Sequence, residues 1–185
     1  MSNADRKAAA DRILYEFGLL ERLEEIGKAH IIGSYRMDMM AWNDLDIDIE
    51  NSGMSMEKLY ALTVFIIERF RPDWYEAKQV IDDKGRAFWF QGFETTVTGD
   101  KWNVDLWFFS EDAIAEAEAY CDDISARATS QQREYIVAIK QELIASGLYS
   151  FEQFKSMDVY KAVLEDGAKD IESFLALFES EKASV

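Results

Sequence analysis

The chain has 185 residues, of which 36 are acidic and 20 are basic, and its formal net charge is -16. This charge repels nucleic-acid phosphates and anionic lipid headgroups, so it argues against a nonspecific DNA or RNA binder and against a membrane-surface protein. Hydrophobic residues make up 49% of the chain, which excludes a disordered protein and is enough for a core. One cysteine and one histidine exclude an internal disulfide and any metal site that needs several of either residue.

No apolar run approaches the roughly 18 residues of a membrane-spanning helix. The first residues also lack the apolar segment of a secretory signal peptide. We therefore expect a cytoplasmic protein that does not act at a membrane. Its acidic surface suits a cationic small-molecule partner.

The first half of the chain predicts helices and short strands. In chain order, we expect a helix, two strands and a second helix over residues 5–26, 29–32, 44–50 and 55–70. Apolar residues recur at three- and four-residue steps in both helices, and at every second position in the second strand. Gly27 is placed to end the first helix, and Ser55 is placed to cap the second.

The second half predicts a sheet followed by helices. We expect three strands and then four helices, over residues 74–81, 86–98, 101–109, 110–120, 130–146, 157–165 and 170–180. Turn signals at 82–85 and 98–101 favour an antiparallel meander of the three strands. The fold class is therefore α+β, with a small mixed or antiparallel sheet flanked by helices and a C-terminal helical segment. We expect an α+β domain over 1–109 and a helical region packed on it over 110–185.

Three acidic residues alternate with apolar residues in the strand at 44–50. Side chains two residues apart point to the same side of a strand, so Asp44, Asp46 and Asp48 share one face. Neighbouring carboxylates repel each other and lose hydration when they are covered, and a hard cation such as Mg²⁺ relieves both costs. The plain alternative is a half-buried strand whose acidic face is solvated.

Other segments carry groups that suit a metal-bound phosphate. Asp105 lies between apolar residues of a later strand, where an unpaired carboxylate is costly unless a cation or a partner faces it. Gly33 lets the backbone approach a ligand, and its amide, with the amide and hydroxyl of Ser34, can hold phosphate oxygens. Arg36 can neutralise a phosphate. A plain turn at Gly33 and a solvated loop arginine are the alternatives.

The order and spacing of these segments resemble the nucleotidyltransferase superfamily of DNA polymerase beta-like enzymes. The resemblance covers residues 28–109 and rests on three segments: Gly33-Ser34, Asp44-Leu45-Asp46 after a gap of nine residues, and the apolar strand around Asp105. It is closest to small bacterial nucleotidyltransferases that modify antibiotics such as lincosamides or aminoglycosides.

The resemblance implies a role for each matching residue. Gly33 and Ser34 would bind the triphosphate of an NTP donor such as ATP. Asp44 and Asp46 would hold Mg²⁺ or Mn²⁺, and Asp105 would complete the metal site or serve as the base.

The resemblance also bears on which two acids form the pair. Members of the superfamily usually carry a small polar residue just before the first acid, and Asn43 fills that place. This favours the pair Asp44 and Asp46 over the pair Asp46 and Asp48. Asp48 is then an additional carboxylate behind the metal site.

Three function hypotheses follow. The first is a Mg-dependent nucleotidyltransferase that moves a nucleoside monophosphate from an NTP to a hydroxyl of a small molecule, with an aminoglycoside- or lincosamide-like acceptor favoured by the net charge. The alternative is a catalytically silent binding or antitoxin-like module of the same fold, suggested by the apolar, methionine-rich loop at 35–42. The third is a plain α+β domain that binds no metal. The expected partners are an NTP and a small acceptor, without nucleic acid or membrane, and the sequence allows a homodimer.

Overall fold

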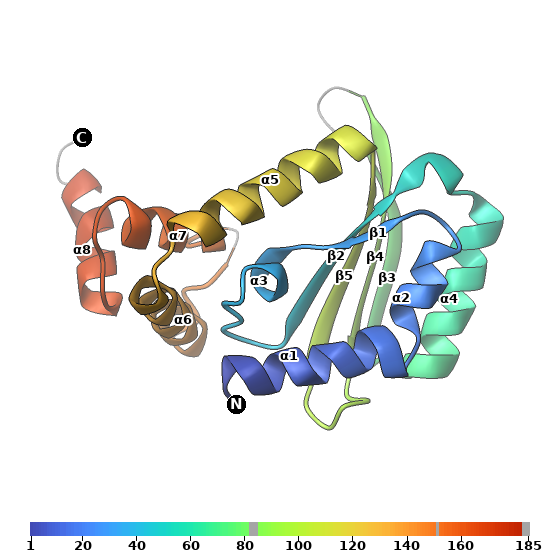
Figure 1. Ribbon diagram of the computed structural model, residues 1–185, viewed down its shortest axis with the longest axis horizontal. Coiled ribbons are helices and arrows are strands. Elements are labelled where there is room, and N and C mark those ends of the chain that lie inside the picture. The colour runs from blue at the N-terminus through green and yellow to red at the C-terminus, as the bar shows by residue number, and fades with distance from the viewer. Residues whose placement is uncertain (82–84, 151, 183–185) are drawn as a thin grey trace. The chain divides into compact units, whose positions relative to one another are not determined.

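The computed structural model describes residues 1–81, 85–150 and 152–182. The first half contains α1 (Asn3–Asp11), the π-helical turn η1 (Arg12–Glu16), α2 (Leu19–Glu24), β1 (Ala29–Ile31), α3 (Gly33–Arg36), β2 (Asp44–Glu50), the 3₁₀ turn η2 (Asn51–Gly53) and α4 (Met56–Phe70). The second half contains β3 (Trp74–Ile81), β4 (Ala87–Thr95), β5 (Trp102–Phe109), α5 (Glu111–Arg127), α6 (Ser130–Ala145), α7 (Ser156–Leu164) and α8 (Ile171–Lys182) (Figure 1).

The chain divides into two compact units, and the division falls between Cys121 and Asp122, inside α5. The first unit holds the sheet, and the second holds the remaining helices. The boundary expected after residue 109, where β5 ends, stays a prediction. None of the helices in the described part of the chain is long and apolar enough to cross a membrane.

A five-stranded sheet in the order β1-β2-β5-β4-β3 forms the centre of the first unit. Strands β3, β4 and β5 make the expected antiparallel meander, and β1 is antiparallel to β2. Strand β2 is parallel to β5, because the chain crosses over through α4 and the meander before it returns beside β2. The expected α+β class, with a mixed sheet, flanking helices and C-terminal helices, is confirmed.

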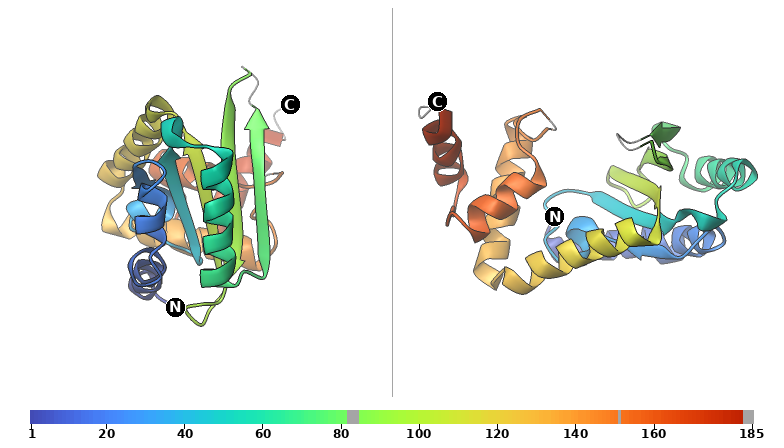
Figure 2. Two further views of the ribbon diagram at one scale, coloured as in Figure 1. Left: turned by 90° about the vertical axis from the view of Figure 1, so that its right-hand side faces the viewer. Right: turned by 90° about the horizontal axis from the view of Figure 1, so that it is seen from above.

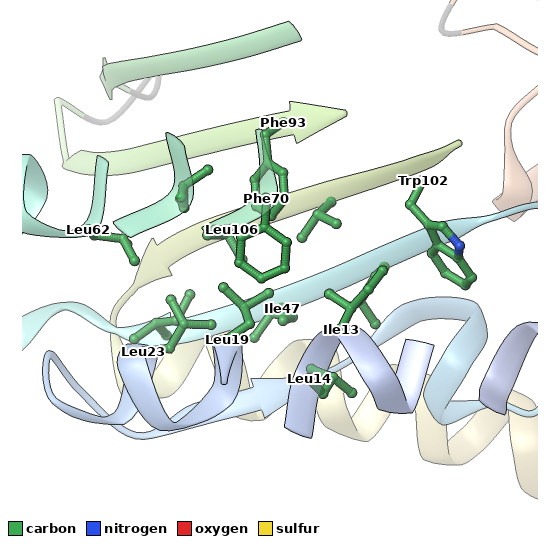
Figure 3. Close-up of a cluster of buried hydrophobic side chains, with 14 of the residues drawn as sticks. Ile13, Leu14, Leu19, Leu23, Ile47, Leu62, Phe70, Phe93, Trp102 and Leu106 are labelled. Atoms are coloured by element: carbon green, nitrogen blue, oxygen red, sulfur yellow. The ribbon is translucent and has the colours of Figure 1, made fainter. Parts of the chain in front are cut away.

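One face of the sheet builds the core. Helices α2 and α4 lie on that side of the sheet, and the first part of α5 lies on the other side (Figures 1 and 2). Phe70 at the end of α4 packs its ring 5.1 Å from the ring of Phe93 in β4. Figure 3 shows this cluster, to which β2 and β5 contribute every second residue: Leu45, Ile47, Ile49, Val104, Leu106 and Phe108.

The expectation of one continuous helix over residues 5–26 is wrong. The chain forms α1, the π-helical turn η1 and α2, with a break at Gly18, whose φ of +75° lies in the left-handed region that glycine adopts readily. The apolar spacing predicted the buried face correctly, because all three segments pack on the same core. The spacing carried no sign of the break, since helical segments on either side keep the same three- and four-residue steps.

The later elements lie close to their predicted positions. Ser55 caps α4 and Thr129 forms a capping box with Gln132 at the start of α6. The largest difference is α5, which was expected over 110–120 and continues to Arg127. Of the turn expected at 82–85, residues 82–84 lie outside the described residues.

The second unit is a small helical assembly with its own packed interior. The rings of Phe154, Phe174 and Phe178 lie within 5.0 Å of one another, measured between centroids. Lys140 in α6 is also buried, with its ammonium near the hydroxyl of Tyr160.

Candidate metal centre

Strands β2 and β5 bring three carboxylates together. In the parallel register, Asp46 lies opposite Asp105, and Asp44 lies opposite Asn103. All of these side chains point to the face of the sheet opposite the core, because the residues between them are the buried apolar ones. One carboxylate oxygen from each of Asp44, Asp46 and Asp105 lies within 4.8 Å of the other two, so the three acids can hold a metal ion.

The environment of these acids is only partly hydrated. Each of the three is half-buried. The amide of Asn103 donates a hydrogen bond of 2.8 Å to Oδ1 of Asp44. Burial raises the pKa of Asp105, while the side chain of Asn103 and the charge of Lys78 oppose this shift. Three anions held close together with limited water form a site that a hard divalent cation stabilises.

The end of β1 places Gly33 directly beside Asp46. The Ile32 amide donates a hydrogen bond of 3.1 Å to the backbone carbonyl of Asp46, and Gly33 then adopts a φ of +63°. A Cβ atom on Gly33 would lie only 2.3 Å from Oδ2 of Asp46. Position 33 therefore requires glycine for two reasons: its backbone conformation and the space that the Asp46 carboxylate occupies.

The expected glycine–serine turn is the start of α3, a single helical turn. Ser34 is buried, and its carbonyl accepts a hydrogen bond of 3.0 Å from the Met39 amide. Whether Gly33 and Ser34 bind a phosphate stays a prediction. Their place next to Asp46 is what such a role needs.

Arg36 ends α3 in an ion pair. Its Nη1 lies 2.8 Å from Oε1 of Glu118 in α5, and the same oxygen lies 3.2 Å from Nδ1 of His30. The hydrogen bond with His30, followed by the charges of His30 and Arg36, lowers the pKa of Glu118. Arg36 is therefore held at the edge of the site by a carboxylate, and its role toward a phosphate stays a prediction.

Asp48 lies on the same face but outside the group of three. It pairs with His30 in the β1–β2 register and is 2% exposed. Its Oδ1 has no hydrogen-bond partner among the described residues. Burial, together with repulsion from Asp46, raises the pKa of Asp48 to about 7, although His30 opposes the shift. The geometry thus groups Asp44 with Asp46, as Asn43 suggested, and leaves Asp48 behind the site.

Two residues of the site escaped the sequence analysis. Asn103 supports Asp44, as described above. Gly92 in β4 lies opposite Asp105, and a Cβ there would lie 2.5 Å from the ring of Phe90 and 3.1 Å from Oδ1 of Asp105. The available signal was a lone glycine inside an apolar strand, which often marks a close approach.

The methionine-rich loop has a structural explanation. Met37, Met39 and Met40 are all buried, and Met40 belongs to the main core cluster. Flexible thioether side chains fill irregular spaces in cores well. The apolar character of this loop therefore reflects packing.

Solved structures resemble this chain, although no family model and no curated protein sequence matches it. A cytoplasmic RNA terminal U-transferase aligns with a TM-score of 0.58 and 16% identity over 89% of this chain and 48% of that one. The Cid1 poly(U) polymerase bound to Mg 3′-dATP aligns with a TM-score of 0.60 and 15% identity, over 89% of this chain and 50% of that one. The non-canonical poly(A) polymerase GLD-2, in complex with GLD-3, aligns with a TM-score of 0.56 and 13% identity, over 91% of this chain and 59% of that one.

These likenesses show the fold. The chain has the nucleotidyltransferase fold of these solved proteins, as its sequence predicted. It spans about half the length of the solved proteins that it resembles. Within the fold, an Asp-x-Asp pair on β2 and a third aspartate on β5 form an acidic triad that could hold a metal ion.

Proposed function

We propose that this protein is a metal-dependent nucleotidyltransferase that moves a nucleoside monophosphate from an NTP to a hydroxyl of a small molecule. The observation that carries the proposal is the triad itself, whose three carboxylate oxygens converge within 4.8 Å. Clustered carboxylates cost stability when no cation is near, and a bound divalent cation removes that cost.

Each residue of the site has a role in this reaction. Asp44, Asp46 and Asp105 would hold Mg²⁺ or Mn²⁺, which when bound supplies charge neutralisation at the phosphates. The acceptor oxygen attacks the α-phosphorus, the bond to the β-phosphate oxygen breaks, and pyrophosphate leaves. Asp105, whose pKa burial raises, takes the proton of the acceptor hydroxyl.

The residues of α3 serve the donor. Gly33 brings its amide next to Asp46, and with Ser34 it holds phosphate oxygens of the NTP. Arg36 neutralises phosphate charge when it is released from Glu118. In this class of reaction, positioning and charge neutralisation supply most of the catalysis.

The acceptor is the part that the fold leaves open. The solved proteins named above are an RNA terminal U-transferase, a poly(U) polymerase and a poly(A) polymerase, as their names state, but this chain carries a net charge of -16. An acidic protein repels an RNA backbone and attracts cations. We therefore propose a cationic, hydroxylated small acceptor of the aminoglycoside or lincosamide kind, and RNA is the competing outcome of the test.

A catalytically silent module of the same fold is the second candidate. One observation favours it: Arg36, the cation nearest the glycine turn in the sequence, is already paired with Glu118. The apolar loop at 35–42 no longer supports this candidate, because its methionines are buried in the core. This candidate predicts metal or nucleotide binding without transfer.

The first experiment is a thermal-shift assay with Mg²⁺ or Mn²⁺ and each NTP. A ligand that binds only the folded state at 100 times its Kd adds about 2.7 kcal/mol of stability. We expect one metal–NTP combination to stabilise the wild type and Asp100→Asn, an exposed matched control, but not Asp46→Asn. Stabilisation that survives in Asp46→Asn, or none with any combination, would contradict the proposal.

A transfer assay then separates the two candidates and the acceptors. Pyrophosphate release from the stabilising NTP is measured with kanamycin, lincomycin or a short oligo(A) RNA as acceptor. Release with an antibiotic supports the proposed acceptor class, and release with RNA alone rejects it. Nucleotide binding without release, with any acceptor, favours the silent module. The KM of a charge-steered acceptor should also rise with salt concentration, because salt screens the attraction.

A further inference from the structure

Four aromatic side chains lie beside the triad on the face of the sheet opposite the core, which we call the open face. We define the aromatic surface as Phe88, Phe90, Trp107 and Phe109. The rings of Trp107 and Phe109 are parallel, with 5.5 Å between their centroids, and the rings of Phe90 and Trp107 are 4.4 Å apart. Phe88 lies 5.0 Å from Phe109 and 5.8 Å from Trp107. The four rings therefore form one continuous surface.

The position of these rings is unusual for a sheet whose core lies on the other side. Trp107 and Phe109 alternate with Leu106 and Phe108, which are fully buried in the core. Residues that face away from the core are normally polar in such strands. Phe88, Trp107 and Phe109 remain half-exposed, so burial in the core does not explain them.

The aromatic surface reaches the triad through Phe90. Its ring lies over Gly92, so closely that a Cβ on Gly92 would come within 2.5 Å of it. Gly92 pairs with Asp105 in the β4–β5 register, and that same Cβ would lie 3.1 Å from Oδ1 of Asp105. Gly92 thus leaves room for an aromatic ring next to the carboxylate that would accept the proton.

The other end of the surface opens into two hollows. One, of about 300 Å³, is lined by Phe88 and Phe109 together with Asn51, Ser110 and Arg86. The second, of about 310 Å³, shares Asn51 and Ser110 and adds three acids: Glu50, Glu111 and Asp112. A ring-lined hollow that also holds a guanidinium therefore adjoins an acidic one.

Charges divide along the two sides of the aromatic surface. Glu50 of β2 lies opposite Phe109 in the register, so a carboxylate borders the rings on that side. On the β3 side, Lys78 lies over the ring of Phe90, and it is paired with Glu76. A bound cation is therefore directed away from Lys78 and Arg86, toward Glu50 of β2 and the acids at the start of α5.

We propose that the aromatic surface binds the acceptor, which is then an amphiphilic amine: an apolar or planar ring body with a protonated amine and a hydroxyl. This inference rests on the proposed function and deepens it by naming the chemistry of the acceptor. The ring body lies on Trp107, Phe109 and Phe88, the amine faces the acidic hollow, and the hydroxyl reaches Asp105. At about 3.3 Å per strand residue, the hydroxyl lies roughly 7–13 Å from the stacked ring.

Two chemical alternatives fit less well. A fully hydrated polycationic sugar has no apolar face and would leave the rings uncovered. An RNA 3′ end could stack a base on aromatic rings, which are sequence-tolerant platforms, but its phosphates would meet the carboxylates of β2 and α5. The combination of rings and acids selects a small amphiphilic cation over both.

The test compares variants that remove or keep one ring. Phe109→Leu removes the ring, Phe109→Tyr keeps it, and Trp74→Leu removes an exposed aromatic residue outside the aromatic surface. With lincomycin as the acceptor, we expect Phe109→Leu to raise the KM about three- to tenfold, the range that aromatic contacts provide. The kcat and the stabilisation by metal–NTP should stay unchanged. Phe109→Tyr and Trp74→Leu should behave as the wild type.

Other results would overturn the proposal. These are an unchanged KM in both Phe109→Leu and Phe88→Leu, or a lower KM for kanamycin or oligo(A) RNA than for lincomycin in the wild type. Thermal melting of each variant without ligand excludes a loss through misfolding.

A direct measurement separates this inference from the proposed function. Titration of lincomycin into the full chain by calorimetry needs no transfer. Suppose that the protein shows no nucleotide binding or transfer but binds lincomycin, and that Phe109→Leu weakens this binding while Trp74→Leu does not. The proposed function is then rejected, and the binding role of the aromatic surface is supported. If lincomycin does not bind at all, the aromatic surface as proposed is rejected, whatever happens with the NTP.

Discussion

The two faces of the same strands differ in what they do. On one face, β2 and β5 present aliphatic and aromatic side chains that are fully buried against the helices. On the other face, the alternating residues of the same strands are carboxylates, an amide and half-buried rings. Burial of apolar surface on the first face stabilises the fold, whereas repulsion between like charges on the second face destabilises it. The difference teaches that stability and chemistry are separated here by the two-residue period of a strand.

The largest expected effect lies on the core face. Leu106→Ala removes a fully buried side chain next in sequence to Asp105, and it should lower the free energy of unfolding by about 2–5 kcal/mol. Urea unfolding followed by circular dichroism measures this. Phe109→Leu on the open face should cost clearly less, because its ring is half-exposed. Equal costs for the two variants would remove the contrast between the faces.

The next effect concerns the glycine that approaches Asp46. Gly33→Ala should cost about 1–2 kcal/mol through its left-handed backbone conformation. The added Cβ should also displace the Asp46 carboxylate and weaken Mg²⁺ binding about tenfold. Gly18→Ala is the matched control, because it has the same kind of backbone conformation with nothing within 4 Å of the added Cβ. Equal Mg²⁺ affinity in both variants would argue against the close approach.

A smaller effect of opposite sign is expected for the triad. Asp105→Asn removes one of three clustered negative charges, so in EDTA it should stabilise the protein by about 1 kcal/mol, the interaction of two unit charges about 4 Å apart in water. Added Mg²⁺ should stabilise the wild type and leave the variant unchanged. Thermal melting with and without Mg²⁺ measures both. If the variant is less stable than the wild type in EDTA, the Asp105 side chain stabilises the fold through its packing contacts.

The smallest effect concerns Glu118. Since its partners lower its pKa below the ordinary 4.5, its ion pair stabilises the fold above that pH, and the contribution is lost as the pH falls through the lowered value. Glu118→Gln should therefore cost about 0.5–1 kcal/mol at pH 7, and this cost should shrink as the pH falls below 4.5. Melting curves across this range measure the difference. A cost that does not depend on pH would show that the glutamate acts through its shape rather than its charge.

Local patterns in the sequence carried much of the fold and of the site. The alternation over 44–50 predicted the second strand and placed its acids on one face, because the period of a strand is a local property. Asp105 stood out because an acid between apolar residues is costly. The spacing of Gly33, the acid pair and Asp105 was enough to suggest the nucleotidyltransferase fold, which the likeness to solved structures confirms.

Other features depended on contacts between distant segments. The break at Gly18 left no trace in the apolar spacing. The role of Gly92 depends on the ring of Phe90 and on the register with Asp105, neither of which a local pattern contains. The aromatic surface likewise requires β4 and β5 to be neighbours, since its four rings come from two strands.

The sequence by itself determined which residues could do chemistry, because side-chain type and strand period are local. Only the tertiary structure decided that they do so together. The parallel pairing of β2 with β5 sets Asp46 opposite Asp105, and it exists because the chain crosses over through α4, β3 and β4 before it returns. Such long-range pairing is stabilised by the whole core, so no segment of the sequence specifies it alone.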